Sequence, residues 1–238
     1  MKRSQLKSTT PRRQFLGTIA AGAATIGLAS LTAPAKLGAE PLPLTENEEY
    51  TDPSDPDQWF KKLKGKHRIV FDATQPHEVM PFAWPKVFLL TNQQTGSPAK
   101  DCGVVVVLRH DAIAYAFEDR LWAKYHFGEV FKAPDPKTKE PSLRNPFWNP
   151  KPGDFKIPGV GEVAIGINEL QKDGVMFCVC NMAITVFSAA VAEGMKMKAE
   201  DVKKDWMGGL LPGIQVVPSG VWALGRAQEH GCAYVFAG

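Results

Sequence analysis

The chain has 238 residues, with 28 lysine and arginine residues against 25 aspartate and glutamate residues. Residues 1–35 hold five of the basic residues and no acidic one, so the remainder carries 23 basic and 25 acidic residues, a formal charge of −2. This balance excludes an electrostatic argument for nucleic acid or an anionic membrane surface as a partner. The remainder is long enough for one well-filled domain.

Residues 1–35 have the order of a secretory leader: a basic region, an uncharged stretch rich in alanine and glycine, and a small-residue cleavage pattern at Ala33–Ala35. The adjacent Arg12-Arg13 predicts export by the twin-arginine (Tat) machinery, whose receptor recognises this pair of arginines. We therefore expect a periplasmic protein, cleaved after Ala35 or Ala39. The alternative is a protein anchored in the membrane by an uncleaved leader.

The rest of the chain divides into a tether and a domain. Residues 36–58 are acidic and rich in proline, which predicts an extended tether. Residues 59–238 alternate between two patterns, and continuous apolar runs predict strands that are covered on both faces. These runs are Arg68–Phe71, Gly103–Leu108, Val175–Val179, Ile214–Val217 and Ala233–Phe236. Helices are expected between them, at Pro85–Asn92, Ala112–Phe127, Val163–Lys172, Met182–Met195, Ala199–Trp206 and Ser219–His230.

This alternation predicts an α/β fold, a three-layer α/β/α sandwich around an open, mostly parallel sheet of about five strands. One segment interrupts it, a loop at residues 128–161 that is rich in proline and glycine. A loop this long in a compact domain is usually functional or an interaction surface. Phe147 and Trp148 at its centre either line a ligand mouth or subunit contact, or fasten the loop to the domain.

Ligands in open α/β sheets bind beyond the carboxyl ends of the strands, and this rule selects three segments. The first is Arg109-His110-Asp111, where Arg109 suits an anion and His110 suits proton transfer or a metal. The alternative is an ordinary capped helix start. The third segment, Pro218-Ser219-Gly220, opens a helix whose free N–H groups could hold an anion or a thiolate. Plain helix capping by Ser219 explains this segment equally well.

The second segment contains two of the four cysteines of the chain, Cys178 and Cys180. Residues two apart in a strand share a face, and Cys180 is nearer the carboxyl end. At the start of the next helix, Cys180 meets the positive helix terminus, which favours a thiolate. Cys178 is expected to be an inert core residue, and a bridge between the two is geometrically awkward. Four cysteines are too few for a disulfide framework, although one or two bridges stay open in an oxidising compartment.

Other function classes have no sequence motif here. No Gly-x-Gly-x-x-Gly or phosphate-binding loop follows a strand, and no Gly-x-Ser-x-Gly elbow is present. The histidines lack the close spacing of a zinc motif, although a mixed site of His110 with Cys180 is chemically allowed. We therefore expect no organic cofactor and assign no metal ligand.

The segment from Gly174 to Tyr234 resembles the DsrE-like family of sulfur-relay proteins. Val175–Asn181 is similar to a strand that ends in the family's cysteine, and Leu210–Gly220 is similar to its final strand-to-helix passage. Gln228–Tyr234 is similar to the end of the last helix and the closing strand. The asparagine that the family places two residues after its cysteine follows Cys180 directly here, as Asn181.

This resemblance implies an α/β/α sandwich that assembles into homo-oligomers. It also implies that Cys180 carries sulfur as a persulfide or takes part in thiol redox chemistry with a sulfur-donor or thiol partner. We expect Cys180 and His110 as the catalytic residues, with Arg109, Asn181, Ser219 and Gly220 around the ligand. The alternative is a non-catalytic periplasmic module that binds a metal or small anion through His110 and Cys180. Whether the protein is an enzyme stays open.

Overall fold

The computed structural model describes residues 56–238. The leader expected over residues 1–35, and the expected tether up to residue 55, lie outside the described residues. The first described element is the short helix α2 (Pro56–Phe60), which buries Trp59 and Phe60. The last three residues assigned to the tether are therefore helical.

Five parallel strands form the central sheet, in the order β6-β5-β2-β1-β7. Their bounds are His67–Ala73 (β1), Cys102–Leu108 (β2), Val175–Cys180 (β5), Ile214–Val217 (β6) and Ala233–Phe236 (β7). Each of the five expected apolar runs is a strand, because a continuous apolar run buries side chains on both faces of a sheet. The α/β class, the strand number and the parallel arrangement expected from the sequence are confirmed.

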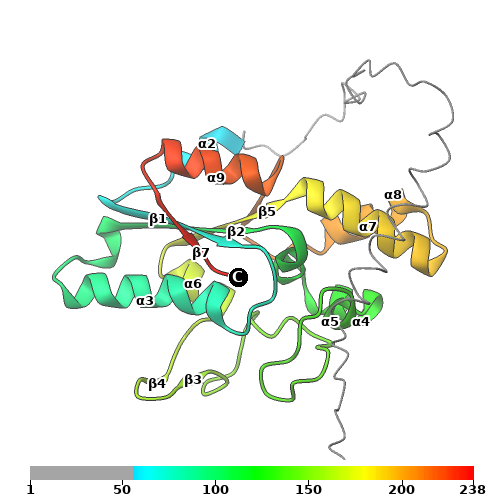
Figure 1. Ribbon diagram of the computed structural model, residues 1–238, viewed down its shortest axis with the longest axis horizontal. Coiled ribbons are helices and arrows are strands. Elements are labelled where there is room, and N and C mark those ends of the chain that lie inside the picture. The colour runs from blue at the N-terminus through cyan, green and yellow to red at the C-terminus, as the bar shows by residue number, and fades with distance from the viewer. Residues whose placement is uncertain (1–55) are drawn as a thin grey trace, which may run out of the picture. The chain divides into compact units, whose positions relative to one another are not determined.

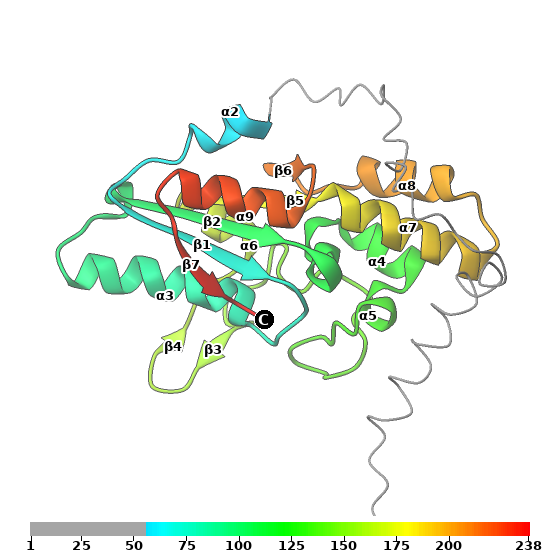
Figure 2. The same cartoon turned by 45° about the horizontal axis from the view of Figure 1, so that its top comes forward.

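Helices cover both faces of this sheet, as Figures 1 and 2 show. Helix α9 (Gly220–Glu229) crosses one face together with α2, while α3 (Met80–Gln94) and α6 (Ile167–Lys172) cover the other. Val70, Val105 and Val107 point into the smaller core under α9, and their neighbours in sequence point into the larger core opposite. The alternation of side chains along each strand thus produces a three-layer sandwich.

The helices that follow β5 extend beyond the sheet. Helix α7 (Asn181–Met195) starts directly at the end of β5 and packs along α8 (Ala199–Gly208). The helices α4 (Asp119–Tyr125) and α5 (Phe127–Val130) lie near them in Figures 1 and 2. Four expected helices, which correspond to α6, α7, α8 and α9, match with shifted ends, whereas α3 begins at Met80 rather than Pro85. Pro81 occupies its first turn, where backbone N–H groups have no partner within the helix, so the N–H that proline lacks costs nothing there. Pro85 lies inside the helix.

The single helix expected over Ala112–Phe127 is wrong. The chain forms a 3₁₀ helix, η2 (His110–Ala116), then α4 and α5. Phe117 has extended backbone angles and forms a bridge with Leu210, which lies just after the end of α8. This long-range contact interrupts the local helical pattern, which is a tertiary effect that propensity does not contain.

The loop at residues 128–161 is anchored at its centre. Phe147 is fully buried and stacks on Phe82 and Phe155, with ring centroids 4.1 and 5.0 Å away. The Asn145 amide donates to the carbonyl oxygens of Tyr115 and Phe117. Phe147 therefore fastens the loop to the domain. The loop region also contains the end of α5 and a small antiparallel sheet of two strands, β3 (Lys156–Ile157) and β4 (Gly161–Glu162). A further 3₁₀ turn, η1 (Ala99–Asp101), precedes β2.

The expectation that all five strands are covered on both faces is wrong for β7. This strand pairs with β1 at an edge of the sheet, and Tyr234 and Phe236 are 45% and 55% exposed. The apolar pattern of β7 is that of a buried strand, but only the strand order reveals that β7 lies at an edge.

Candidate functional site

The site at the carboxyl end of the sheet is organised by an ion pair between Arg109 and Asp72. The Nε and Nη2 atoms of Arg109 donate to the two carboxylate oxygens of Asp72, at 2.6 and 2.8 Å. Asp72 is 1% exposed, and the Arg109 side chain is 28% exposed. The hydrogen bond to Asp72 raises the pKa of Arg109 above its ordinary value, and nearby Tyr234 and Cys180 act in the same direction.

Tyr234 completes the arrangement around Asp72. Its hydroxyl donates to Asp72 Oδ2 at 2.8 Å, and this hydrogen bond raises the pKa of Tyr234. Parallel register explains the meeting, because Asp72 and Tyr234 lie on adjacent strands and Arg109 follows Leu108, which pairs with Ala73. One carboxylate thus joins the ends of β1, β2 and β7.

Asp72 and Tyr234 were not among the residues selected from the sequence. An acidic residue at the end of the apolar run Ile69–Phe71 was a signal that could have identified Asp72. Tyr234 carried no comparable signal, because its role depends on β7 being placed beside β1.

Gly220 brings the start of α9 against Arg109. A Cβ atom at Gly220 would stand 2.5 Å from Arg109 Cβ, so only glycine allows this approach. Ser219 is the N-cap of α9, and its hydroxyl accepts a hydrogen bond from Trp222 N at 3.2 Å. The Ser219 side chain is therefore occupied by capping, which was the plainer of its two expected roles.

Cys180 is the last residue of β5 and the N-cap of α7. Its sulfur accepts a hydrogen bond from the backbone N–H of Ala183 at 3.2 Å, and Cys180 is 6% exposed. Asn181 is the first residue of α7 and is half-buried, and its carbonyl oxygen accepts from the Thr185 hydroxyl. The expected position of Cys180, at a strand end and a helix start, is what the fold provides.

The other three cysteines differ from Cys180 in their surroundings. Cys178 is fully buried in the core under α9, and burial raises the pKa of its thiol strongly. Burial raises the pKa of Cys232 to about 11 and also raises that of Cys102. All four cysteines lie within residues 56–238 and their thiols are free, so none of the bridges that the sequence left open is present in this part of the chain.

His110 follows Arg109 directly but faces another part of the molecule. Its backbone is left-handed, with a φ of 50°, a conformation that histidine adopts more readily than most residues. The ring packs edge-on against Phe187 of α7 at 5.5 Å, and Nδ1 lies 3.3 Å from Asp111 Oδ1. Within residues 56–238, no hydrogen bond or ion pair joins His110 to Cys180 or Arg109.

The described part of the chain offers few side chains that could bind a metal together. Between residues 56 and 238, no three histidine, cysteine, aspartate or glutamate side chains are grouped so that they could hold a metal ion. The Arg109 guanidinium, expected to hold an anion, is already paired with Asp72.

The described part of the chain, residues 56–238, contains no helix that is both long and apolar enough to span a membrane.

Comparisons with known proteins give little beyond this geometry. No protein-family model matches the chain, and no curated protein matches it. Among solved structures, a protein of unknown function from Methanobacterium thermoautotrophicum is similar over 72% of this chain and 99% of its own, at 19% identity and a TM-score of 0.37. A similarity of this size establishes neither a shared fold nor a shared function.

Proposed function

We propose that this protein handles sulfur or thiol redox chemistry through a reactive thiolate at Cys180. The observation that carries the proposal is the position of Cys180 Sγ, which accepts the Ala183 N–H at the positive end of a 15-residue helix. Both the N–H group and the helix terminus stabilise negative charge on the sulfur. Arg109 adds a nearby positive charge, since the electrostatic interaction with Cys180 is one of the causes that raise the pKa of Arg109.

Asp72 and Tyr234 act on this site through Arg109. The aliphatic part of Arg109 lies against Gly220, and the bidentate pair with Asp72 fixes the guanidinium at the end of β1. We therefore assign positioning roles to Asp72 and Tyr234, with Cys180 as the reacting group. Asn181 and the Ser219-Gly220 turn border the same strand ends.

The step that this arrangement supports is transfer of a sulfane sulfur. The Cys180 thiolate attacks the outer sulfur of a low-molecular-weight persulfide, R–S–SH, and forms a new S–S bond. The S–S bond of the donor, between its R–S group and the outer sulfur, breaks, and R–S⁻ leaves with the electron pair. Cys180 is then a persulfide, no net oxidation occurs, and no organic cofactor is required. The analogous attack of the Cys180 thiolate on a disulfide gives the thiol redox variant of the same chemistry.

The resemblance to the DsrE-like family and the twin-arginine leader support this proposal from the sequence side. Together they suggest a sulfur-handling protein of the periplasm, exported by the Tat machinery and working with a sulfur donor or thiol partner. Cys180 is the residue that matches the family's cysteine.

The test is selective alkylation of the folded, reduced full-length chain at pH 6, with a limiting amount of iodoacetamide. Peptide mass spectrometry reports each cysteine separately. We expect Cys180 to be labelled first, although Cys102 is the more exposed thiol, because the Ala183 N–H and the start of α7 stabilise a thiolate at Cys180. Burial, by contrast, raises the pKa of the Cys102, Cys178 and Cys232 thiols. In a separate sample that has not been alkylated, incubation with glutathione persulfide should add one sulfur to Cys180.

Two variants provide the controls. Cys102→Ser should leave the fast labelling and the sulfur addition unchanged, whereas Cys180→Ser should abolish both. Labelling of Cys102 ahead of Cys180, or sulfur addition that survives in Cys180→Ser, would remove the basis of the proposal.

A further inference from the structure

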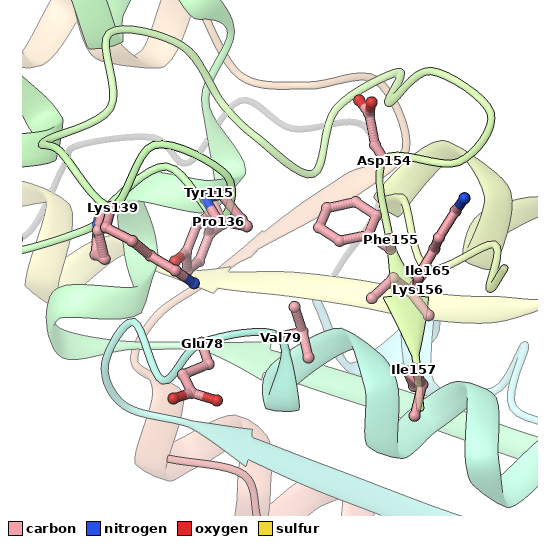
Figure 3. Close-up of a pocket in the computed structure, with 11 residues that line it drawn as sticks. Glu78, Val79, Tyr115, Pro136, Lys139, Asp154, Phe155, Lys156, Ile157 and Ile165 are labelled. Carbon is pink, nitrogen blue, oxygen red and sulfur yellow. The ribbon is translucent and has the colours of Figure 1, made fainter. Parts of the chain in front are cut away.

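A pocket of about 410 Å³ lies on the opposite face of the sheet from α9, between the start of α3 and the loop at residues 128–161. Figure 3 shows its lining residues. Neither Cys180 nor Arg109 lines it, so it is separate from the site described above. Its volume falls in the range of small-molecule sites in proteins.

One wall of this pocket is apolar. Phe155 and Ile165 are buried core residues that face the pocket, and Val79 and Ile157 are half-buried. The Phe155 ring is held parallel to Phe147, with centroids 5.0 Å apart. This support keeps a flat apolar surface in place, which suits the body of an aromatic or branched aliphatic molecule.

Tyr115 of η2 also lines the pocket and is only 2% exposed. Its ring is fixed edge-on between Phe82 and Phe147, at 5.2 and 5.3 Å. Within residues 56–238 its hydroxyl has no hydrogen-bond partner. Burial raises the pKa of Tyr115, so the phenol stays protonated and is a hydrogen-bond donor. Within the described residues this hydroxyl is not one of the fully buried atoms that lack a partner, so it is accessible at the pocket and available to a molecule there.

Two charged side chains at the pocket have no ion-pair partner in the described part of the chain, Lys139 and Glu78. Asp154 and Lys156, by contrast, are paired with Lys137 and Glu162. In Figure 3 the Lys139 ammonium extends toward the middle of the pocket, and the Lys156 ammonium lies on the far side of Phe155. Lys139 is therefore the cation that can meet an occupant.

We propose that this pocket binds a small monocarboxylate with an aromatic or branched aliphatic body. The Tyr115 hydroxyl and the Lys139 ammonium both donate to the carboxylate, while Phe155, Val79 and Ile165 contact the body. Glu78 at the rim disfavours a second negative charge on the ligand. The loop at residues 128–161 supplies Lys139 and Phe155, so this loop builds much of the site.

The first measurement is isothermal titration calorimetry of the full chain with 3-phenylpropionate, matched against its neutral analogue 3-phenylpropionamide. We expect saturable 1:1 binding of the acid and an affinity for the amide about tenfold lower, because the amide carries no charge. Phenylsuccinate, with a second carboxylate, should also bind more weakly than 3-phenylpropionate. Methyl NMR locates the site, since the Ile165 and Ile157 signals should shift and that of Ile184, in α7, should not.

Three variants separate the two donors from general effects of charge. Tyr115→Phe keeps the ring packing and removes only the hydroxyl, and it should weaken acid binding about tenfold. Lys139→Gln should weaken it about threefold, with less effect at high salt, because Lys139 is exposed. Lys156→Gln removes an equal charge that is paired elsewhere and should leave the affinity unchanged.

The proposal is overturned if the acid shows no saturable binding, or if acid and amide bind equally. It is also overturned if Tyr115→Phe binds as tightly as the parent chain, or if Ile184 shifts in place of Ile165. Alkylation of Cys180 is unaffected by any of these results, so this proposal and the proposed function fail independently.

Discussion

Gly220 marks the point where the start of α9 meets the residue that follows β2. Its missing side chain leaves room for the Arg109 aliphatic chain, whose Cβ and Cδ would lie 2.5 and 2.8 Å from an added Cβ. Gly225, in the same helix, has no heavy atom within 4 Å of an added Cβ. Packing against Arg109 therefore requires glycine at position 220, whereas no neighbour requires it at position 225.

We expect Gly220→Ala to destabilise the fold by about 1–3 kcal/mol, because Arg109 must shift to accept the methyl group. The free energy of unfolding in urea measures this change. Gly225→Ala is the matched control and should stabilise by about 0.5–1 kcal/mol, since alanine is the better helix former and meets no neighbour. A neutral or stabilising Gly220→Ala would contradict the contact.

At the scale of elements, Asp205 connects α8 to α4. Its carboxylate accepts hydrogen bonds from Arg120 and Lys124 of α4 and from the Tyr125 hydroxyl, at 2.5 to 2.7 Å. These bonds lower the pKa of Asp205 well below its ordinary value, against the opposing effect of burial. Trp206, the next residue in α8, is fully buried among aromatic rings, so the two helices are joined by both polar and apolar contacts.

We expect Asp205→Asn to lower the free energy of unfolding by about 1–2 kcal/mol at pH 7. The contribution of a carboxylate with a depressed folded pKa is present above its unfolded pKa, about 3.9, and is lost as the pH falls through the folded value. The gap between parent and variant should therefore close on acidification toward pH 2, as measured by urea unfolding at several pH values. Glu229→Gln, at an exposed pair with Arg226, is the control and should show little effect at any pH. A gap that is constant with pH would contradict the assignment.

At the scale of the whole molecule, the carboxylate of Asp72 links distant parts of the chain at one side of the sheet. It joins Arg109, 37 residues away in sequence, to Tyr234, 162 residues away, and so ties the last strand to the first two. The oligomer expected from the family resemblance stays a prediction. Helix α7 exposes Met182, Val186 and Met195, which would suit a subunit contact.

We expect Asp72→Asn to destabilise the fold by about 2–4 kcal/mol, because it leaves Arg109 partly buried without its carboxylate. Asp173→Asn removes an exposed ion pair with Lys86 and should cost less than about 1 kcal/mol. Thermal or urea unfolding of both variants provides the comparison. Equal costs for the two variants would show that the buried pair has no special role.

The sequence determined those features that depend on local pattern. The continuous apolar runs located all five strands, because buried parallel strands need apolar side chains on both faces. The cap at Ser219 and the left-handed Gly231 after α9 also follow from single residues. Cys180 was placed correctly at a strand end because a strand run and a helix run meet there.

Only the tertiary structure decided which strand ends meet. Strand order put β7 at an edge and Tyr234 beside Asp72, and nothing in the sequence near either residue encodes that order. The same holds for Phe117, whose bridge to Leu210 ends a helix that local propensity continues. It holds as well for Tyr115, which lines a pocket together with residues of the loop at 128–161. Local patterns fix what a segment can be, whereas long-range pairing fixes its neighbours, and a site is made of neighbours.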